Sequence, residues 1–333
     1  MHAIARAAVA VAAIVALAAC GDTGPEPDDA PAGAGFPVAI EHKFGTTEIP
    51  SRPERVVTVG FTEQDALLAL GITPVGEREF GGGYAYRDRP WAQEALDGAE
   101  PATVGGDEIS FERVAAQRPD LIIGVNSGMT EDEYRRLSDI APTVAQSDEY
   151  IDFGVPWQEQ TMVIGRAVGR EDEARALVRD VEARFARARD EHPEFAGTRM
   201  VLGYGAGGNF GAHTSRDYRA QFFEDLGFEP DERVDELAGD SFFIDFDDEQ
   251  FRLLEQELLV MYATRAAVTE DPVVGRLDAV DEERVVYLDL EDQFAGALGF
   301  SSPLSLPYLL DEAVPKLAAA ADGDPGTTAP EPR

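Results

Sequence analysis

Cysteine, lysine and histidine are scarce in this chain of 333 residues. Its single cysteine, Cys20, excludes an internal disulfide and any zinc or iron–sulfur site built on several thiolates. Lys and Arg total 28 against 64 Asp and Glu, and the resulting charge of −36 argues against binding to nucleic-acid phosphates. The four histidines are widely separated and predict no clustered metal site. Apolar residues make up 44%, which indicates a packed globular protein long enough for two domains.

The first residues have the pattern of an export signal. After Arg6, residues 7–19 form an apolar run shorter than the roughly 20 residues that a membrane-spanning helix needs. Small residues then precede Cys20, in a pattern that resembles the lipobox of bacterial lipoproteins. We therefore expect residues 1–19 to be a lipoprotein signal peptide and Cys20 to carry the lipid. The alternative is a secreted protein with a free thiol.

Two further segments have almost nothing to bury. Residues 20–36 and 322–333 are rich in Gly, Pro and Asp, a composition typical of flexible chain. We interpret them as a tether between lipid and domain and as a C-terminal tail. The folded part between them would then work outside the cytoplasm, at the outer face of the cell membrane.

Between these ends, short apolar runs alternate with helix-like stretches, which indicates an α/β fold. In the first half, residues 55–60 and 119–125 read as buried strands, and residues 62–70 as a helix capped by Thr62. The second half repeats this order, with strands over 199–204 and 257–262. The repetition predicts two related lobes, at residues 37–154 and 194–321.

Residues 155–193 separate the two halves. Their apolar residues recur at spacings of three and four, which predicts one long helix of about 50 Å at 1.5 Å per residue. Gly165 and Gly169 are the positions near its start where it would be interrupted.

Residues 41–77 and 111–145 resemble the N-terminal lobe of ferric-siderophore-binding lipoproteins of ABC importers, and the stretch after Trp157 resembles the inter-lobe helix of that family. The resemblance extends over about residues 38–320. It implies two Rossmann-like lobes joined by one long α-helix, with the ligand in the cleft between them. It also implies a monomer that is not an enzyme and has no cofactor. The ligand would be a ferric siderophore whose chelator holds the iron, and the partners would be permease subunits with a cytoplasmic ATPase.

Because open α/β sheets bind ligands at the carboxyl ends of their strands, the loops that follow the strands are the expected binding loops. Several carry aromatic residues and Arg beside Gly. Aromatic faces would cover the apolar rim of a chelate, and Arg would bind its oxygens. Trp91 has an alternative interpretation as the cap of a hydrophobic cluster, and Phe294 and Phe300 are equally well explained as packing residues. The candidate ligand residues are Arg78, Tyr84, Tyr86, Trp91, Tyr204, Arg216, Tyr218 and Arg265.

Two acidic residues occupy matched positions in the two halves. Glu112 precedes Asp120 by the same interval as Glu249 precedes Glu257. In related binding proteins, one Glu on the outer face of each lobe docks onto Arg of the permease, so the resemblance implies this role for Glu112 and Glu249. Asp248 would substitute for Glu249 if the register differs by one. The alternative is that each is an ordinary acid in the first turn of a helix, where the dipole favours it.

Other functions were weighed against this one. Residues 203–208 match the GxGxxG pattern of an oxidoreductase, but no helix is expected to open there. Asp245, Asp247 and Asp248 lack the spacing of a calcium loop, and no nucleophile motif predicts a hydrolase. A purely structural lipoprotein would bind nothing. The nearest alternative is the same fold with haem or cobalamin, with Tyr204 or Tyr218 as an axial ligand to haem.

Overall fold

The computed structural model describes residues 35–79, 89–206, 208–247, 249–289 and 292–322. All of them fall within one compact unit, Gly33–Arg333. The predicted signal peptide and Cys20 lie outside the described residues, as do Tyr84, Tyr86, Asp248 and most of the predicted tether and tail. None of the helices in the described ranges has the length and apolar character needed to cross a membrane.

The N-terminal half contains a parallel sheet with strand order β5-β4-β3-β6-β7. An antiparallel hairpin of β1 (Val38–His42) and β2 (Gly45–Ile49) precedes it. The sheet strands are β3 (Val56–Thr58), β4 (Gly76–Arg78), β5 (Ala102–Gly105), β6 (Leu121–Gly124) and β7 (Thr143–Ala145). The helices are α1 (Glu63–Ala69), the 3₁₀ helix η2 (Pro90–Ala92), α2 (Gln93–Leu96), α3 (Phe111–Ala116) and α4 (Glu131–Ser138). We call this half the N-lobe.

The C-terminal half contains a mixed sheet with strand order β11-β9-β8-β12-β13, and β10 pairs with β8. Its strands are β8 (Arg199–Ala206), β9 (Asn209–His213), β10 (Glu229–Pro230), β11 (Phe243–Asp245), β12 (Leu258–Tyr262) and β13 (Val285–Tyr287). Its helices are η3 (Pro193–Phe195), α7 (Gln221–Asp225), α8 (Glu232–Ala238), η4 (Gln250–Leu254), α9 (Arg265–Thr269), η5 (Val274–Arg276), α10 (Asp278–Asp281), α11 (Gln293–Phe300) and α12 (Ser305–Ala321). We call this half the C-lobe.

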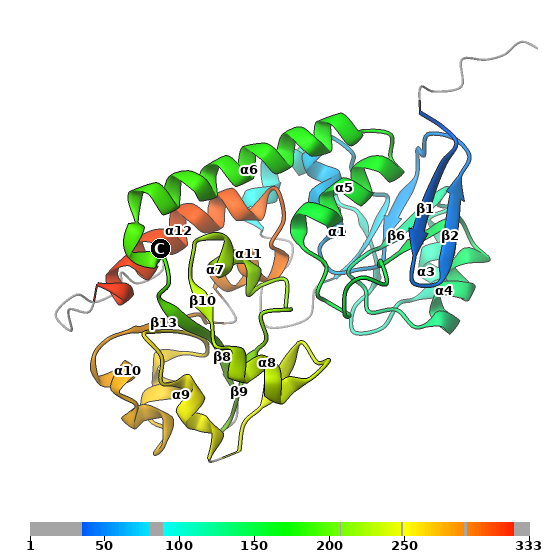
Figure 1. Cartoon of the computed structure of the whole chain (residues 1–333). Coiled ribbons are helices and arrows are strands. Elements are labelled where there is room, and N and C mark those ends of the chain that lie inside the picture. The colour runs from blue at the N-terminus through cyan, green and yellow to red at the C-terminus, as the bar shows by residue number, and fades with distance from the viewer. Residues whose placement is uncertain (1–34, 80–88, 207, 248, 290–291, 323–333) are drawn as a thin grey trace, which may run out of the picture. The chain divides into compact units, whose positions relative to one another are not determined.

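The connecting segment is interrupted near its start, where Gly165 and Gly169 marked the possible break, so it consists of two helices, and the second is the long inter-lobe helix. They are α5 (Trp157–Ala167) and α6 (Glu171–Glu191). Gly169 adopts a φ of +68°, and the N–H of Arg170 donates to the carbonyl of Gly165 at 2.7 Å, so the break is a Schellman-type C-cap. The 21-residue helix α6 then joins the lobes, because Ala174 packs in the N-lobe core and Phe185 in the C-lobe core (Figure 1).

Thr62 stands at the N-terminus of α1, but its side chain does not cap the helix as predicted. Its hydroxyl instead donates to Oε1 of Gln160 on α5 at 2.9 Å. The buried carboxylate of Glu63 accepts the N–H of Thr62 at 3.1 Å and that of Asn126 at 2.6 Å. A short-range pattern could not reveal that Thr62 and Glu63 bond to these partners, because Gln160 and Asn126 are far away in the sequence.

Candidate ligand-binding site

Five aromatic rings form a continuous series that passes from one lobe to the other. The centroid distances are 6.2 Å from Phe61 to Phe153, 5.2 Å from Phe153 to Phe242, 4.9 Å from Phe242 to Phe243 and 6.2 Å from Phe243 to Tyr204. We call these five residues the aromatic arc. Phe61 follows strand β3 of the N-lobe, Phe153 lies between the lobes before α5, and the other three belong to the C-lobe.

The rings of the arc are not sealed into a core. Phe61, Phe153, Phe242 and Tyr204 are half-buried, and Phe243 is 38% exposed. Single exposed apolar side chains are common, but a contiguous series of exposed rings is typical of a binding surface. Their faces therefore offer an apolar surface that spans both lobes.

Phe153 adopts a φ of +61°, a conformation that is a clear outlier for a bulky residue. Its carbonyl accepts the N–H of Tyr218 from the C-lobe at 3.2 Å. Its ring lies so close to Gly128 of the N-lobe that a Cβ on Gly128 would come within 2.7 Å of it. Contacts from both lobes thus hold Phe153 in this strained conformation, which places its ring in the arc.

Arg78 stands at the N-lobe end of the arc. Its guanidinium lies 4.1 Å from the ring centre of Phe61. It donates to four backbone carbonyls, those of Val59, Gly106, Asp107 and Ser127, from loops that follow different strands. Burial lowers the pKa of Arg78, and the carboxylate of Glu63 opposes that shift. Arg78 therefore organises the loops and fixes Phe61, and it supplies positive potential at this end.

Arg219, which the sequence reasoning missed, stands at the C-lobe end. His213 links it to the arc, with its ring centroid 5.3 Å from that of Tyr204. The guanidinium of Arg219 lies 2.5 Å from Oδ2 of Asp217 and 3.0 Å from Nδ1 of His213. Burial lowers the pKa of His213 and Arg219 lowers it further, while the carboxylate of Asp217, 3.1 Å from Nδ1 of His213, opposes the shift. Burial alone would raise the pKa of Asp217, but Arg219 and His213 hold it well below its usual value.

The phenol hydroxyls of Tyr204 and Tyr218 both donate hydrogen bonds within the C-lobe. The hydroxyl of Tyr204 donates to Oδ1 of Asp245 at 2.6 Å, and that of Tyr218 to the carbonyl of Gly299 at 2.6 Å. Burial raises the pKa of both phenols, and for Tyr204 the Asp245 carboxylate raises it further. Tyr204 therefore offers the arc its ring, while Tyr218 is buried within the C-lobe.

A family model described as periplasmic binding protein matches residues 56–291, which is more than half of the chain. The chain belongs to the periplasmic binding protein family. Its structure is similar to that of a periplasmic solute binding protein from Mycobacterium smegmatis, with 36% identity and a TM-score of 0.75 over 85% of this chain and 98% of that one. It is also similar to PiaA of Streptococcus pneumoniae in complex with ferrichrome, with 26% identity and a TM-score of 0.75 over 86% and 99% of the two chains.

One curated relative is the probable siderophore-binding lipoprotein YfiY of Bacillus subtilis, 31% identical over 150 residues. The matched stretch covers 44% of this chain and 43% of that relative, so the chain spans less than half the length of YfiY in this match.

In this binding protein, the other predicted ligand residues occupy different surroundings. Arg216 is partly exposed, and its carbonyl lies beside Gly154, next to Phe153 of the arc. Arg265 begins α9, pairs with Glu283 and lies 5.0 Å from the ring centre of Tyr287. Arg216 is therefore adjacent to the arc. Arg265 makes these contacts on α9, next to strand β13 of the C-lobe.

Trp91 lies where the N-lobe meets α11 and α12. Its ring is 5.6 Å from that of Phe300 and 5.6 Å from that of Tyr308, and its indole N–H donates to Oδ2 of Asp65 at 2.7 Å. These contacts fit the alternative in which Trp91 caps a hydrophobic cluster. Phe294 is buried in the C-lobe core, and Phe300 is fully buried beside Trp91.

The two acids singled out by their spacing are both exposed. Glu112 lies in the first turn of α3, and Glu249 is the residue before η4, which is a 3₁₀ helix where an α-helix was predicted. The acids that follow Glu112 and Glu249 at the matched interval also make matching hydrogen bonds. Asp120 accepts the N–H of Arg55 at the start of β3, and Glu257 accepts the N–H of Arg199 at the start of β8.

The GxGxxG pattern does not form a nucleotide-binding turn. Strand β8 runs through Gly203 and Gly205 to Ala206, and the antiparallel strand β9 begins at Asn209. A dinucleotide fingerprint requires a helix to open at this point, so the glycines here belong to a β-hairpin.

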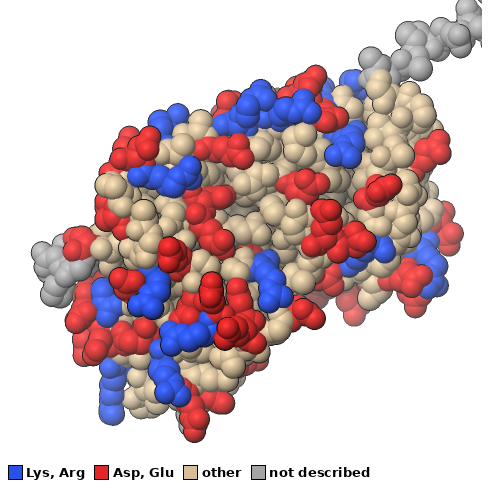
Figure 2. Space-filling model, viewed as in Figure 1, with Lys and Arg blue, Asp and Glu red and all other residues tan. Residues whose placement is uncertain are grey.

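Charge is distributed differently over the surface and the arc. Acidic side chains spread across the face shown in Figure 2, with arginines among them along α6. Within the described ranges, no group of three or more His, Cys, Asp or Glu is arranged to hold a metal ion. At the arc, Arg78 lies beside Phe61, whereas Arg219 pairs with Asp217 and Asp245 accepts from the hydroxyl of Tyr204.

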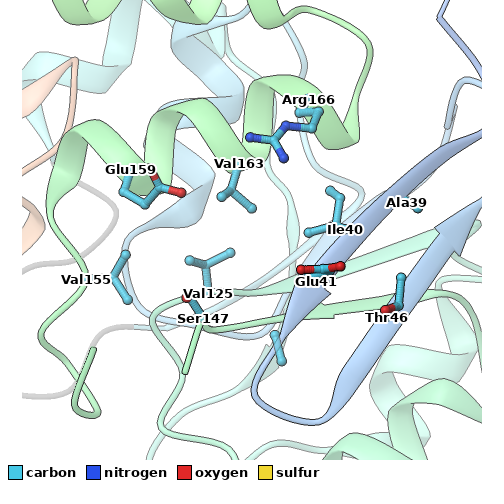
Figure 3. A pocket seen from close by; sticks show the side chains of 11 residues that line it. Ala39, Ile40, Glu41, Thr46, Val125, Ser147, Val155, Glu159, Val163 and Arg166 are labelled. Atoms are coloured by element: carbon cyan, nitrogen blue, oxygen red, sulfur yellow. The ribbon is translucent and has the colours of Figure 1, made fainter. Parts of the chain in front are cut away.

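A separate cavity of about 260 Å³ lies in the N-lobe between the β1–β2 hairpin and α5 (Figure 3). Apolar side chains and three charged ones line it: Ile40, Val125, Val155, Val163, Glu41, Glu159 and Arg166. Neither the arc nor any predicted ligand residue contributes to this lining. The cavity lies on one lobe, whereas the arc spans both lobes.

Proposed function

We propose that this protein captures a ferric siderophore for an ABC importer and delivers it to the permease. Membership of the periplasmic binding protein family supports a solute-binding role rather than an enzymatic one, and a location outside the cytoplasm. The ferrichrome held by PiaA and the name of YfiY support a siderophore as the ligand. Lipid on Cys20 would anchor the protein at the outer face of the membrane.

The observation that carries this proposal is the aromatic arc. A ferric siderophore is a bulky chelate with an apolar rim and oxygen ligands around the iron. Half-buried rings match the rim, and the guanidinium of Arg78 beside Phe61 supplies positive potential that matches the oxygens. Because the arc crosses from lobe to lobe, the ligand would lie between them.

The hydrogen bonds of Tyr204 and Tyr218 favour a ferric chelate over haem as the ligand. An axial Tyr ligand to haem must be a free phenolate, whereas Tyr204 and Tyr218 both donate hydrogen bonds and have raised pKa values. Neither tyrosine is therefore suited to ligate haem iron.

Docking onto the permease would use Glu112 and Glu249, one on each lobe. Two exposed anions at equivalent positions would fix orientation and steer the encounter with a basic partner. Asp120 and Glu257, which follow them at the same interval, make matching hydrogen bonds to the starts of β3 and β8, and this supports the assignment.

Isothermal titration with ferric complexes of a hydroxamate, a catecholate and citrate, and with haem and cobalamin, tests the ligand. We expect one ferric chelate to bind with a dissociation constant of about 1 μM or below, and its iron-free chelator to bind more weakly. Phe243→Ala should weaken that binding, whereas Phe44→Ala, outside the arc, should not. Binding of haem or cobalamin alone, or of nothing, would overturn the proposal.

A further inference from the structure

The carboxylate of Asp65 joins the two lobes. Asp65 lies in α1 of the N-lobe and is fully buried. It accepts from Nη1 of Arg89 at 2.9 Å and from the indole N–H of Trp91 at 2.7 Å, both in its own lobe. A third donor is the hydroxyl of Ser302 in the C-lobe, 3.0 Å away. A buried carboxylate with three donors is held firmly in place.

Ser302 belongs to a rigid part of the C-lobe. It lies between α11 and α12, and its hydroxyl accepts the N–H of Ser305 while its own N–H donates to the hydroxyl of Ser305. Helix α12 is anchored by buried Leu306, Leu309 and Leu317 in the same core cluster as Phe185 of α6. The bond from Ser302 to Asp65 therefore ties α1 to the body of the C-lobe.

Aromatic packing shields the hydrogen bond between Ser302 and Asp65, which we call the inter-lobe tie, from water. The rings of Trp91 and Phe300, one from each lobe, lie 5.6 Å apart, and the guanidinium of Arg89 lies 5.2 Å from the ring centre of Phe300. The side chain of Arg89 is only 1% exposed. Excluding water lowers the local dielectric and strengthens charge-assisted bonds such as those of Asp65.

The inter-lobe tie constrains the angle between the lobes in a way that α6 alone does not. A helix packed in both cores resists bending, but the lobes can still tilt around it. A second attachment between other elements, α1 and the start of α12, opposes that tilt. We propose that Asp65 is a positioning residue that holds the lobes at one angle and keeps the two ends of the aromatic arc facing each other. Its effect on affinity rests on the proposed function, but its effect on lobe angle does not.

Ser302→Ala tests this inference, because it removes the inter-lobe bond and leaves the Asp65–Arg89 pair intact. Ser301→Ala is the matched control, since the neighbouring hydroxyl is also buried but donates within the C-lobe to the carbonyl of Leu298. Spin labels on Glu131→Cys in α4 and Glu236→Cys in α8, in the full chain with Cys20→Ser, report the inter-lobe distance by electron–electron double resonance. Both labelled positions are exposed.

We expect Ser302→Ala to broaden or shift the distance distribution and Ser301→Ala to leave it unchanged. Ser302→Asp is a second variant that keeps a capping acceptor for Ser305 but places a second carboxylate against Asp65, and it should shift the distance furthest. Ser302→Thr, which retains the hydroxyl, should restore the wild-type distribution. An unchanged distribution in Ser302→Ala and Ser302→Asp, or equal broadening in Ser301→Ala, would overturn the inference.

Affinity is measured with whichever chelate, ferrichrome or ferric citrate, binds the wild type. Ser302→Ala should weaken it about fivefold to tenfold, because a site that must be assembled binds less tightly than a preorganised one. If neither chelate binds the wild type but the distances still change, the proposed function fails and the positioning role of Asp65 stands. If the distances change while affinity stays constant, the link between lobe angle and binding is overturned.

Discussion

The guanidinium of Arg78 lies 4.1 Å from the ring centre of Phe61, at the carboxyl end of the N-lobe sheet. Four backbone carbonyls accept from the same guanidinium, so the cation is fixed and the ring rests against it. This arrangement prepares one end of the arc before any ligand arrives, which reduces the ordering cost of binding.

Phe61→Leu should weaken binding of the ferric chelate about tenfold, because Leu retains apolar bulk but lacks the ring face that stacks and meets Arg78. Isothermal titration measures the change. Phe44→Leu is the control, since Phe44 stacks on Tyr134 in the N-lobe and is not part of the arc. Equal affinity in Phe61→Leu and the wild type would remove Phe61 from the site.

Asp217→Asn should reduce the free energy of unfolding at pH 7 by about 3 kcal/mol or more, because it leaves the buried charge of Arg219 without its partner. The pKa of Asp217 is held below its usual value, so the ion pair contributes its stability above about pH 4 and loses it as the pH falls. The gap between variant and wild type should therefore narrow on acidification.

Urea unfolding followed by circular dichroism, at pH 7 and at several pH values below 4, measures this gap. Asp132→Asn is the control, because that carboxylate is 81% exposed and its loss should change stability little. A gap that widens as the pH falls would contradict the assignment of Asp217 as the partner of Arg219.

Charge reversal of both docking residues, Glu112→Lys with Glu249→Lys, should abolish uptake of the chelate by cells and leave its affinity unchanged. Radioactive-iron uptake and isothermal titration measure the two effects. Asp172→Lys on α6, an equally exposed reversal away from the matched positions, is the control. Lost ligand binding in the double variant, or uptake that persists, would contradict the docking role.

Cys20→Ala should release the protein from the membrane fraction, because two acyl chains on Cys20 are the proposed anchor. Mass spectrometry of the N-terminal peptide should find diacylglycerol on Cys20 in the wild type and none in the variant. Ligand affinity of the released protein should equal that of the wild type. An unmodified Cys20 thiol in membrane-bound wild-type protein would refute the lipid anchor.

The fold could be predicted because its signals are local. Buried strands such as 121–124 and 258–262 are short apolar runs, and the repeated order of elements indicated two lobes. The break between α5 and α6 shows the limit: both glycines were visible, but the bond from Arg170 to Gly165 that makes the break a cap depends on conformation.

The candidate site was harder to predict, because its residues come from separate parts of the chain. The sequence pointed to Tyr204, Arg78 and Arg216, which lie in or after strands, but not to Phe153, whose φ of +61° depends on contacts from both lobes. It also missed Arg219, although Asp217 two residues earlier was a visible partner, and it missed the adjacent pair Phe242 and Phe243. Trp91 was predicted from its place in a loop after a strand, with a cluster cap as the alternative, and its indole N–H donates to Asp65.

By itself, the sequence determined the α/β class, the two related lobes, the acidic surface and the scarcity of thiols, because composition and periodicity are properties of the chain read in order. Only the tertiary structure decided which aromatic side chains meet in the arc and which carboxylate ties the lobes together. Asp65 and Ser302 are separated by most of the chain, and no short-range pattern relates them. Packing brings them to 3.0 Å, and because burying Trp91 and Phe300 together excludes water, the carboxylate of Asp65 takes its hydrogen bonds from protein donors such as Ser302.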